Sequence, residues 1–157
     1  MGNALFYHLT QGPLERTLPM LLEKSLERGW RVLVRGGDPA RLGRLDQLLW
    51  KGEDSFLPHG LAGGDHDADQ PVLLAGEEAL PATNGAVCLI CIDGAAVSAD
   101  DVAALERVCI LFDGRDADAT AQARLQWKAL TGAGCVAQYW SEETGRWQMK
   151  TQSGGTD

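Results

Sequence analysis

The cysteine pattern suggests metal or redox chemistry at first sight. Cys88 and Cys91 form a Cys-x-x-Cys pair, a spacing used in zinc and redox sites. They lie, however, in an apolar run (AVCLICID) typical of a buried strand, where residues three apart point to opposite faces. The sequence contains no second Cys or His pair that could complete a tetrahedral zinc site. We therefore interpret both cysteines as small buried hydrophobic residues.

Other candidate ligands and bases are equally isolated. Asp65, His66 and Asp67 can ligate metals by type, but they fall in a Gly-rich polar stretch, residues 62–70, with no rigid element to fix ligand geometry. His59 has no serine or cysteine nucleophile at a recognisable spacing, so we interpret it as a histidine that packs within its loop. We expect no catalytic residue and no bound metal.

Nucleotide-binding motifs are missing as well. The turn after the first predicted strand, HLTQGPLE, contains neither G-x-G-x-x-G nor G-K-[ST], whose glycines let the backbone approach a phosphate. We therefore expect no cofactor, and we interpret His8, inside that strand, as a structural histidine. The alternative is a small nucleotide- or metal-dependent enzyme that binds its ligand near Asp93 and Gly94, where a predicted strand ends.

The most distinctive group lies on the predicted helix of residues 116–131. Arg124 and Lys128 are four residues apart and share one face, next to Trp127 at the edge of the apolar stripe. Arg115, just before the helix, can extend this group. Two cations beside an indole suit a short acidic peptide, because the cations pair with carboxylates and the ring borders a pocket for an apolar side chain. The alternative is a pair of solvated cations beside a half-buried tryptophan.

Residues 45–63 (LDQLLWKGEDSFLPHGLAG) combine a helix end with an apolar loop that carries Trp50 and Phe56. Pro58 fixes its own φ and keeps Leu57 out of the helical region, so we expect an ordered loop. Large apolar side chains on a loop either cover the edge of the core or form a docking surface for another protein. The sequence leaves both alternatives open.

Length and charge narrow the class of protein. The chain has 157 residues, the size of one domain, a formal net charge of −8 and a pI near 4.8. Proteins that grip DNA through phosphates are usually basic, so direct DNA binding is disfavoured. No apolar run approaches the ~18 residues of a membrane span, and the first residues do not form a signal peptide. We expect a cytoplasmic protein with no membrane association.

Hydrophobic periodicity predicts an α/β fold. Strands alternate with helices, which indicates βαβ units and a mainly parallel sheet flanked by helices. The predicted strands are residues 3–9, 30–35, 71–74, 85–93 and 108–112, with a C-terminal antiparallel hairpin of residues 135–140 and 146–150. The predicted helices are residues 13–28, 39–50, 98–107 and 116–131, with Pro19 either kinking or delaying the first of them. We expect one domain, residues 1–150, and a disordered tail, residues 151–157.

Several sequence segments together resemble the chi subunit of bacterial DNA polymerase III, a clamp-loader accessory protein. They are FYHL in the first strand, RLDQLLW at residues 44–50, SFLPHGLAG at residues 55–63 and ARLQWK at residues 123–128. The resemblance extends over nearly the whole chain. It implies a non-catalytic protein with a Rossmann-like fold and no nucleotide.

The resemblance also implies two partners. One is the acidic C-terminal tail of single-stranded-DNA-binding protein, so that DNA is contacted only indirectly; its implied site residues are Arg124, Trp127, Lys128, Arg115 and Phe112. The other is the psi subunit or another clamp-loader component, with implied site residues Trp50, Phe56, Pro58 and His59. Two positions depart from the family pattern. Thr120 stands where the family has a lysine, and Asp113, beside Phe112, is expected to repel an acidic tail.

Overall fold

A computed structural model describes residues 2–10, 12–51, 57–142 and 146–153. Their strands form an eight-stranded sheet in the order β3-β4-β2-β5-β6-β1-β7-β8. The strands are β1 (Asn3–Leu9), β2 (Val32–Gly36), β3 (Gly60–Leu61), β4 (Val72–Gly76), β5 (Cys88–Ile92), β6 (Arg107–Asp113), β7 (Val136–Ser141) and β8 (Gln148–Ser153). All neighbouring strands pair in parallel except β7 and β8, which form the antiparallel hairpin. The predicted fold class is confirmed.

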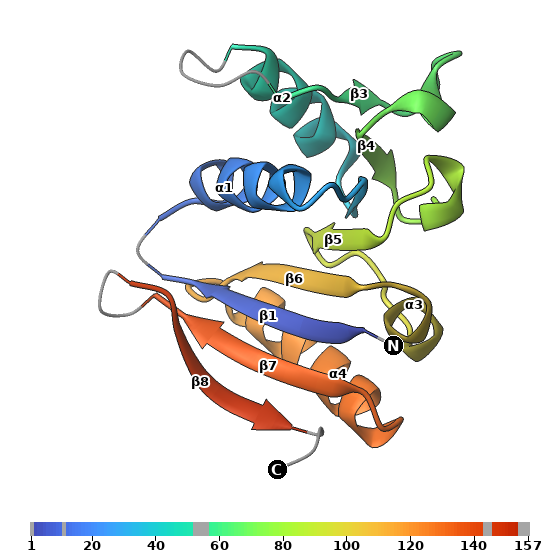
Figure 1. Ribbon diagram of the computed structural model, residues 1–157. Coiled ribbons are helices and arrows are strands. Elements are labelled where there is room, and N and C mark those ends of the chain that lie inside the picture. The colour runs from blue at the N-terminus through green and yellow to red at the C-terminus, as the bar shows by residue number, and fades with distance from the viewer. Residues whose placement is uncertain (1, 11, 52–56, 143–145, 154–157) are drawn as a thin grey trace.

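Helices cover both faces of the sheet (Figure 1). They are α1 (Leu14–Glu27), α2 (Pro39–Trp50), α3 (Ala99–Ala104) and α4 (Ala117–Gly132). Apolar residues of α1 and α2 pack with one face of the strands, and those of α3 and α4 pack with the other. Cys88 belongs to the first of these cores and Cys91 to the second, which confirms that the two cysteines point to opposite faces. Burial raises the pKa of the Cys91 thiol to about 12.

Three of the helices begin where their capping residues predict. The Asp38 carboxylate accepts a hydrogen bond from the backbone N–H of Ala40 at the start of α2, and Pro39 occupies the first helical position. Asp116 caps α4 in the same way. Ser98, rather than Asp100, caps α3 and forms a capping box with Asp101. Because these signals are local, the sequence locates the helix starts well.

Other boundaries differ from the predictions because they depend on contacts distant in sequence. Helix α1 begins at Leu14 and continues through Pro19, so Pro19 does not delay it. Helix α3 ends at Ala104, and Arg107 begins β6 because it pairs with Asn3 of β1. Strand β8 extends to Ser153 and so includes three residues of the predicted tail; residues 154–157 lie outside the described ones.

Two short elements in residues 60–70 were not predicted. Strand β3 pairs with β4, and a 3-10 helix, η1 (Asp67–Asp69), follows it. The Asp67 carboxylate accepts hydrogen bonds from the backbone N–H groups of Gly63 and Gly64, at 3.0 Å and 3.2 Å. Asp67 therefore organises its own turn.

A second 3-10 helix, η2 (Pro81–Thr83), precedes β5. Among the described helices, none combines the length and apolarity needed to cross a membrane.

Candidate functional site

A pocket lies between α4 and strands β6, β1, β7 and β8, on one face of the sheet. Its cavity volume is about 380 Å³. Residues of β1, β6, β7, β8 and α4 line it: Phe6, Phe112, Thr120, Ala123, Arg124, Trp127, Lys128, Tyr139 and Thr151. It brings together four of the five residues that the sequence assigned to one peptide site, Arg124, Trp127, Lys128 and Phe112. Peptide binding there stays a prediction.

Strand pairing builds the strand side of this pocket. Phe6 of β1 is in register with Tyr139 of β7, and Tyr139 is in register with Thr151 of β8. Side chains of directly paired residues emerge on the same face of a sheet. The three residues therefore form one row across three strands, on the face that α4 partly covers.

Helix α4 supplies the opposite wall and the charge. Trp127 is half-buried and packs edge-on against Phe6 and Tyr139; the Trp127 and Tyr139 ring centroids are 6.3 Å apart, with ring planes at 80°. Arg124 and Lys128 are exposed beside it. Within the described part of the chain, neither cation forms an ion pair with a carboxylate. Both are therefore available to an anionic ligand.

Arg115 does not line this pocket, and its predicted part in peptide binding stays a prediction. Its guanidinium is directed at Asp113, with Nε 3.3 Å from a carboxylate oxygen. The backbone N–H of Arg115 donates to the same oxygen at 2.9 Å and, together with the guanidinium, lowers the pKa of Asp113. Both residues line a neighbouring crevice, which shares Phe112 and Ala123 with the pocket beside Trp127. Arg115 places a positive charge beside Asp113, and the expected repulsion of an acidic peptide by Asp113 stays a prediction.

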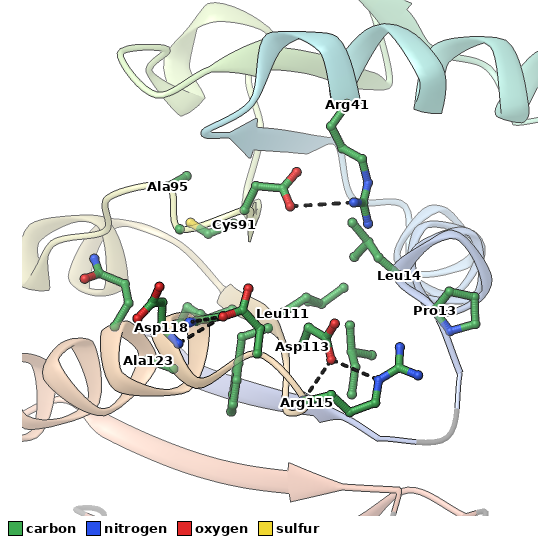
Figure 2. Close-up of a pocket in the computed structure, with 18 of the residues that line it drawn as sticks. Pro13, Leu14, Arg41, Cys91, Ala95, Leu111, Asp113, Arg115, Asp118 and Ala123 are labelled. Carbon is green, nitrogen blue, oxygen red and sulfur yellow. Dashed lines mark hydrogen bonds and ion pairs between the residues drawn. The ribbon is translucent and has the colours of Figure 1, made fainter.

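That crevice has a volume of about 590 Å³ and opens at the carboxyl ends of the strands (Figure 2). The chain leaves β1 toward α1 on one face and leaves the adjacent β6 toward α4 on the other, so a space opens between them. Asp93, with φ of 51°, and Gly94 line it, as the enzyme alternative expects. Burial raises the pKa of Asp93, against the influence of Arg41, whose Nη1 lies 3.9 Å from its carboxylate.

Cys91 and the acidic side chains are the candidates for chemistry in this crevice. Cys91 lines it, but its raised pKa leaves the thiol protonated at neutral pH and therefore weakly nucleophilic. In residues 2–10, 12–51, 57–142 and 146–153, no three His, Cys, Asp or Glu side chains are grouped so as to hold a metal ion. The expectation of no metal site and no cofactor stays a prediction.

The second predicted surface is only partly exposed. Trp50, at the end of α2, is 55% exposed, and its ring lies against that of His59 with centroids 4.6 Å apart. His59 is buried: Nδ1 lies 2.7 Å from the Leu57 carbonyl oxygen, and Nε2 lies 3.1 Å from the Asp46 carboxylate. This confirms that His59 packs within its loop, whereas its predicted part in binding a partner stays a prediction. Pro58 is half-buried, and Phe56 lies outside the described residues.

Comparison with known protein families shows to which family the chain belongs. The family model described as DNA polymerase III chi subunit, HolC, matches residues 1–138. The chain belongs to the chi subunit family. No curated protein sequence matches it closely enough to count as a relative.

The family match ends within β7 of this chi-family protein, one residue before Tyr139. Tyr139 and Thr151 therefore lie beyond the matched region although both line the pocket. Sequence reasoning missed them, and it missed Phe6, because their place in the pocket depends on the order and register of β1, β7 and β8. Only the alternation along each strand, which puts Phe6 and Tyr139 each on one definite face, gave a partial signal.

Proposed function

We propose that this chi-family protein is a non-catalytic accessory subunit of DNA polymerase III that binds the acidic C-terminal tail of single-stranded-DNA-binding protein in the pocket beside Trp127. Through this contact it links the clamp loader to DNA that is already coated by the binding protein. We expect it to act in the cytoplasm and to contact DNA only indirectly.

The observation that carries the proposal is that two exposed cations lie beside an aromatic pocket on a protein that is acidic overall. Arg124 and Lys128 stand beside the pocket without acidic partners among the described residues, although the chain has 22 acidic and 14 basic residues. Acidic groups of a peptide can pair with them, while Phe6, Trp127 and Tyr139 offer an apolar surface to one of its side chains. A peptide that carries both acidic groups and an apolar side chain therefore fits the cations and the aromatic surface together.

A calorimetric titration tests this proposal. The probe is a synthetic peptide of the acidic C-terminal segment of the cognate single-stranded-DNA-binding protein, and the control is the same composition in scrambled order. We expect Arg124→Ala to weaken binding by about 1–3 kcal/mol, since it removes a charge-assisted contact. Rising salt should weaken binding as well, because exposed charges are screened. Absence of binding by the wild-type chain would refute the proposal.

Attachment to the clamp loader requires a second surface, and we propose the region of Trp50 for it. A large side chain that is 55% exposed at the end of a helix is a suitable anchor for a psi subunit or another clamp-loader component. His59, with Pro58 beside it, would support the indole from below rather than touch the partner. Trp50→Ala should abolish capture of the purified clamp loader and leave binding of the tail peptide unchanged.

The crevice near Asp93 and Gly94 supports one alternative function, that of a small nucleotide- or metal-dependent enzyme. A ligand that binds the native state raises the melting temperature by mass action. A thermal-shift screen with nucleotides and divalent metals therefore tests it directly, and stabilisation lost in Asp93→Asn would favour it. A direct DNA binder would instead show steeply salt-dependent binding to naked single strands.

A further inference from the structure

We infer that His8 holds Tyr139 as a fixed wall of the tail pocket, so that the β7–β8 hairpin selects the apolar side chain of the bound peptide. The inference rests on the proposed function and adds the residues that set its specificity. It concerns Tyr139 and Thr151, which lie beyond the residues matched to the family.

His8 is held from three sides. Its ring stacks on Phe112, with centroids 5.0 Å apart and planes at 19°. Gly114 closes a second side so tightly that a Cβ at this position would clash with the imidazole. On the third side, Nδ1 of His8 and the Tyr139 hydroxyl share a hydrogen bond. A ring confined in this way can act as an anchor for the tyrosine.

Tyr139 in turn defines the width of the pocket. Its ring lies edge-on to Trp127 and tilted against Phe112, with centroids 6.3 Å and 6.2 Å away. With its hydroxyl held by His8, the ring has little freedom to swing into or out of the pocket. A wall fixed before binding avoids the entropy cost of ordering it on binding.

Thr151 completes the pocket from β8. It is in register with Tyr139 and is exposed, so its short side chain borders the pocket at the edge of the sheet. The hairpin register is also marked by a 3.3 Å hydrogen bond between the side chains of Gln138 and Gln152. Because neighbours along a strand alternate between faces, Gln152 points away from the pocket. Arg124 and Lys128 thus face the acidic groups of the peptide, and the hairpin faces its apolar side chain.

A double-mutant cycle tests the anchoring role. Affinity for the tail peptide is measured for wild type, His8→Ala, Tyr139→Phe and the double variant. We expect Tyr139→Phe, which keeps the ring, to weaken binding about threefold. The double variant should bind no more weakly than His8→Ala, because both changes remove the same hydrogen bond. Strictly additive losses, or no loss from Tyr139→Phe, would overturn this role.

A second peptide gives a readout that a general structural role would not move. In this peptide the apolar side chains of the tail are replaced by alanine and the acidic residues are kept. Wild type should prefer the natural peptide, and the preference should fall about tenfold in Tyr139→Ala. Arg124→Ala should weaken both peptides by a similar factor. An unchanged preference in Tyr139→Ala would overturn the selection role of the hairpin.

Two substitutions that add the same negative charge test whether Thr151 borders the pocket. Thr151→Glu adds a carboxylate beside the site, whereas Gln152→Glu adds the same charge to the next residue on the opposite face. We expect at least a fivefold loss of affinity in the first and less than a twofold change in the second. Equal effects would overturn the assignment of Thr151.

The tail-binding function and the role of the hairpin can be refuted separately. If the wild-type chain does not bind the peptide, the proposed function is wrong. If wild type binds and Arg124→Ala weakens binding, but the Tyr139 and Thr151 variants bind as wild type does, the proposed function stands and the inference about the hairpin is wrong.

Discussion

The indole of Trp127 in α4 packs edge-on against the phenyl ring of Phe6 in β1, with ring centroids 5.3 Å apart and planes at 68°. Aromatic pairs favour this geometry because the partly positive edge of one ring is attracted to the partly negative face of the other. The contact fixes the last long helix over the first strand. It thereby holds one wall of the pocket in place while Arg124 and Lys128 stay exposed beside it.

The contact between Trp127 and Phe6 should contribute to both stability and peptide binding. Trp127→Ala should lower the free energy of unfolding by about 2–4 kcal/mol, because a half-buried indole is lost from the core beneath α4. It should also weaken the tail peptide by more than tenfold, whereas Trp127→Phe should restore most of the stability. Urea unfolding and calorimetry measure the two effects. Wild-type affinity in a folded Trp127→Ala protein would exclude the indole from the site.

Thr120 offers a test by gain of affinity. It lines the pocket, and the sequence resemblance implies a lysine at this position in the chi family. We expect Thr120→Lys to strengthen peptide binding about two- to fivefold, since an added cation reaches the same ligand. Ala121→Lys adds the same charge to an exposed residue that does not line the pocket and should change affinity less than twofold. If both variants bind equally, net charge rather than position governs affinity.

Asp113 and Arg115 provide a prediction of no effect. Because they pair with each other in the crevice, neither Asp113→Asn nor Arg115→Ala should change peptide affinity by more than about twofold. Arg124→Ala, the matched arginine variant, should lose far more. A loss in Arg115→Ala comparable to that in Arg124→Ala would instead assign Arg115 to the peptide site.

Asp101 makes the stability of the fold depend on pH. Burial alone would raise its pKa, but hydrogen bonds from buried Arg35 (3.0 Å) and from Ser98 lower it below its ordinary value. A carboxyl whose pKa is lower in the folded than in the unfolded state stabilises the fold above its unfolded pKa, and this stability is lost as pH falls through the folded pKa.

Wild type should therefore lose stability below about pH 4, and Asp101→Asn should lose less over the same range. At neutral pH, Asp101→Asn should be about 2–3 kcal/mol less stable, because buried Arg35 loses the negative charge that compensates it and keeps only neutral acceptors such as the carbonyl groups of Ala79 and Ala96. Urea unfolding at several pH values measures both effects. Parallel pH profiles of the two proteins would show that Asp101 does not carry this dependence.

The parts of the site that were predictable are those set by local spacing. Arg124, Trp127 and Lys128 lie within one helix, so the helical repeat brings them together whatever the rest of the chain does. Tyr139 and Thr151 come to the pocket only because β1 lies between β6 and β7 and β8 extends the sheet. No local pattern specifies that strand order.

The places where the structure differs from simple sequence spacing have the same physical origin. Arg115 is close to α4 in sequence, but the turn before the helix directs its guanidinium to Asp113 and the crevice. His59 was assigned both to loop packing and to the partner surface. Its contacts with Leu57 and Asp46 bury it, so loop packing is confirmed, while its place at a partner surface stays a prediction.

The most direct test of the central claim is an NMR titration of the isotope-labelled chain with the tail peptide. The five tryptophans give separate indole N–H signals, so Trp127 and Trp50 can be followed in one experiment. We predict that the Trp127 signal shifts together with the amides of Phe6, Tyr139 and Thr151, while the signal of Trp50 stays in place. Shifts confined to the crevice around Asp93, or to the region of Trp50, would contradict the account.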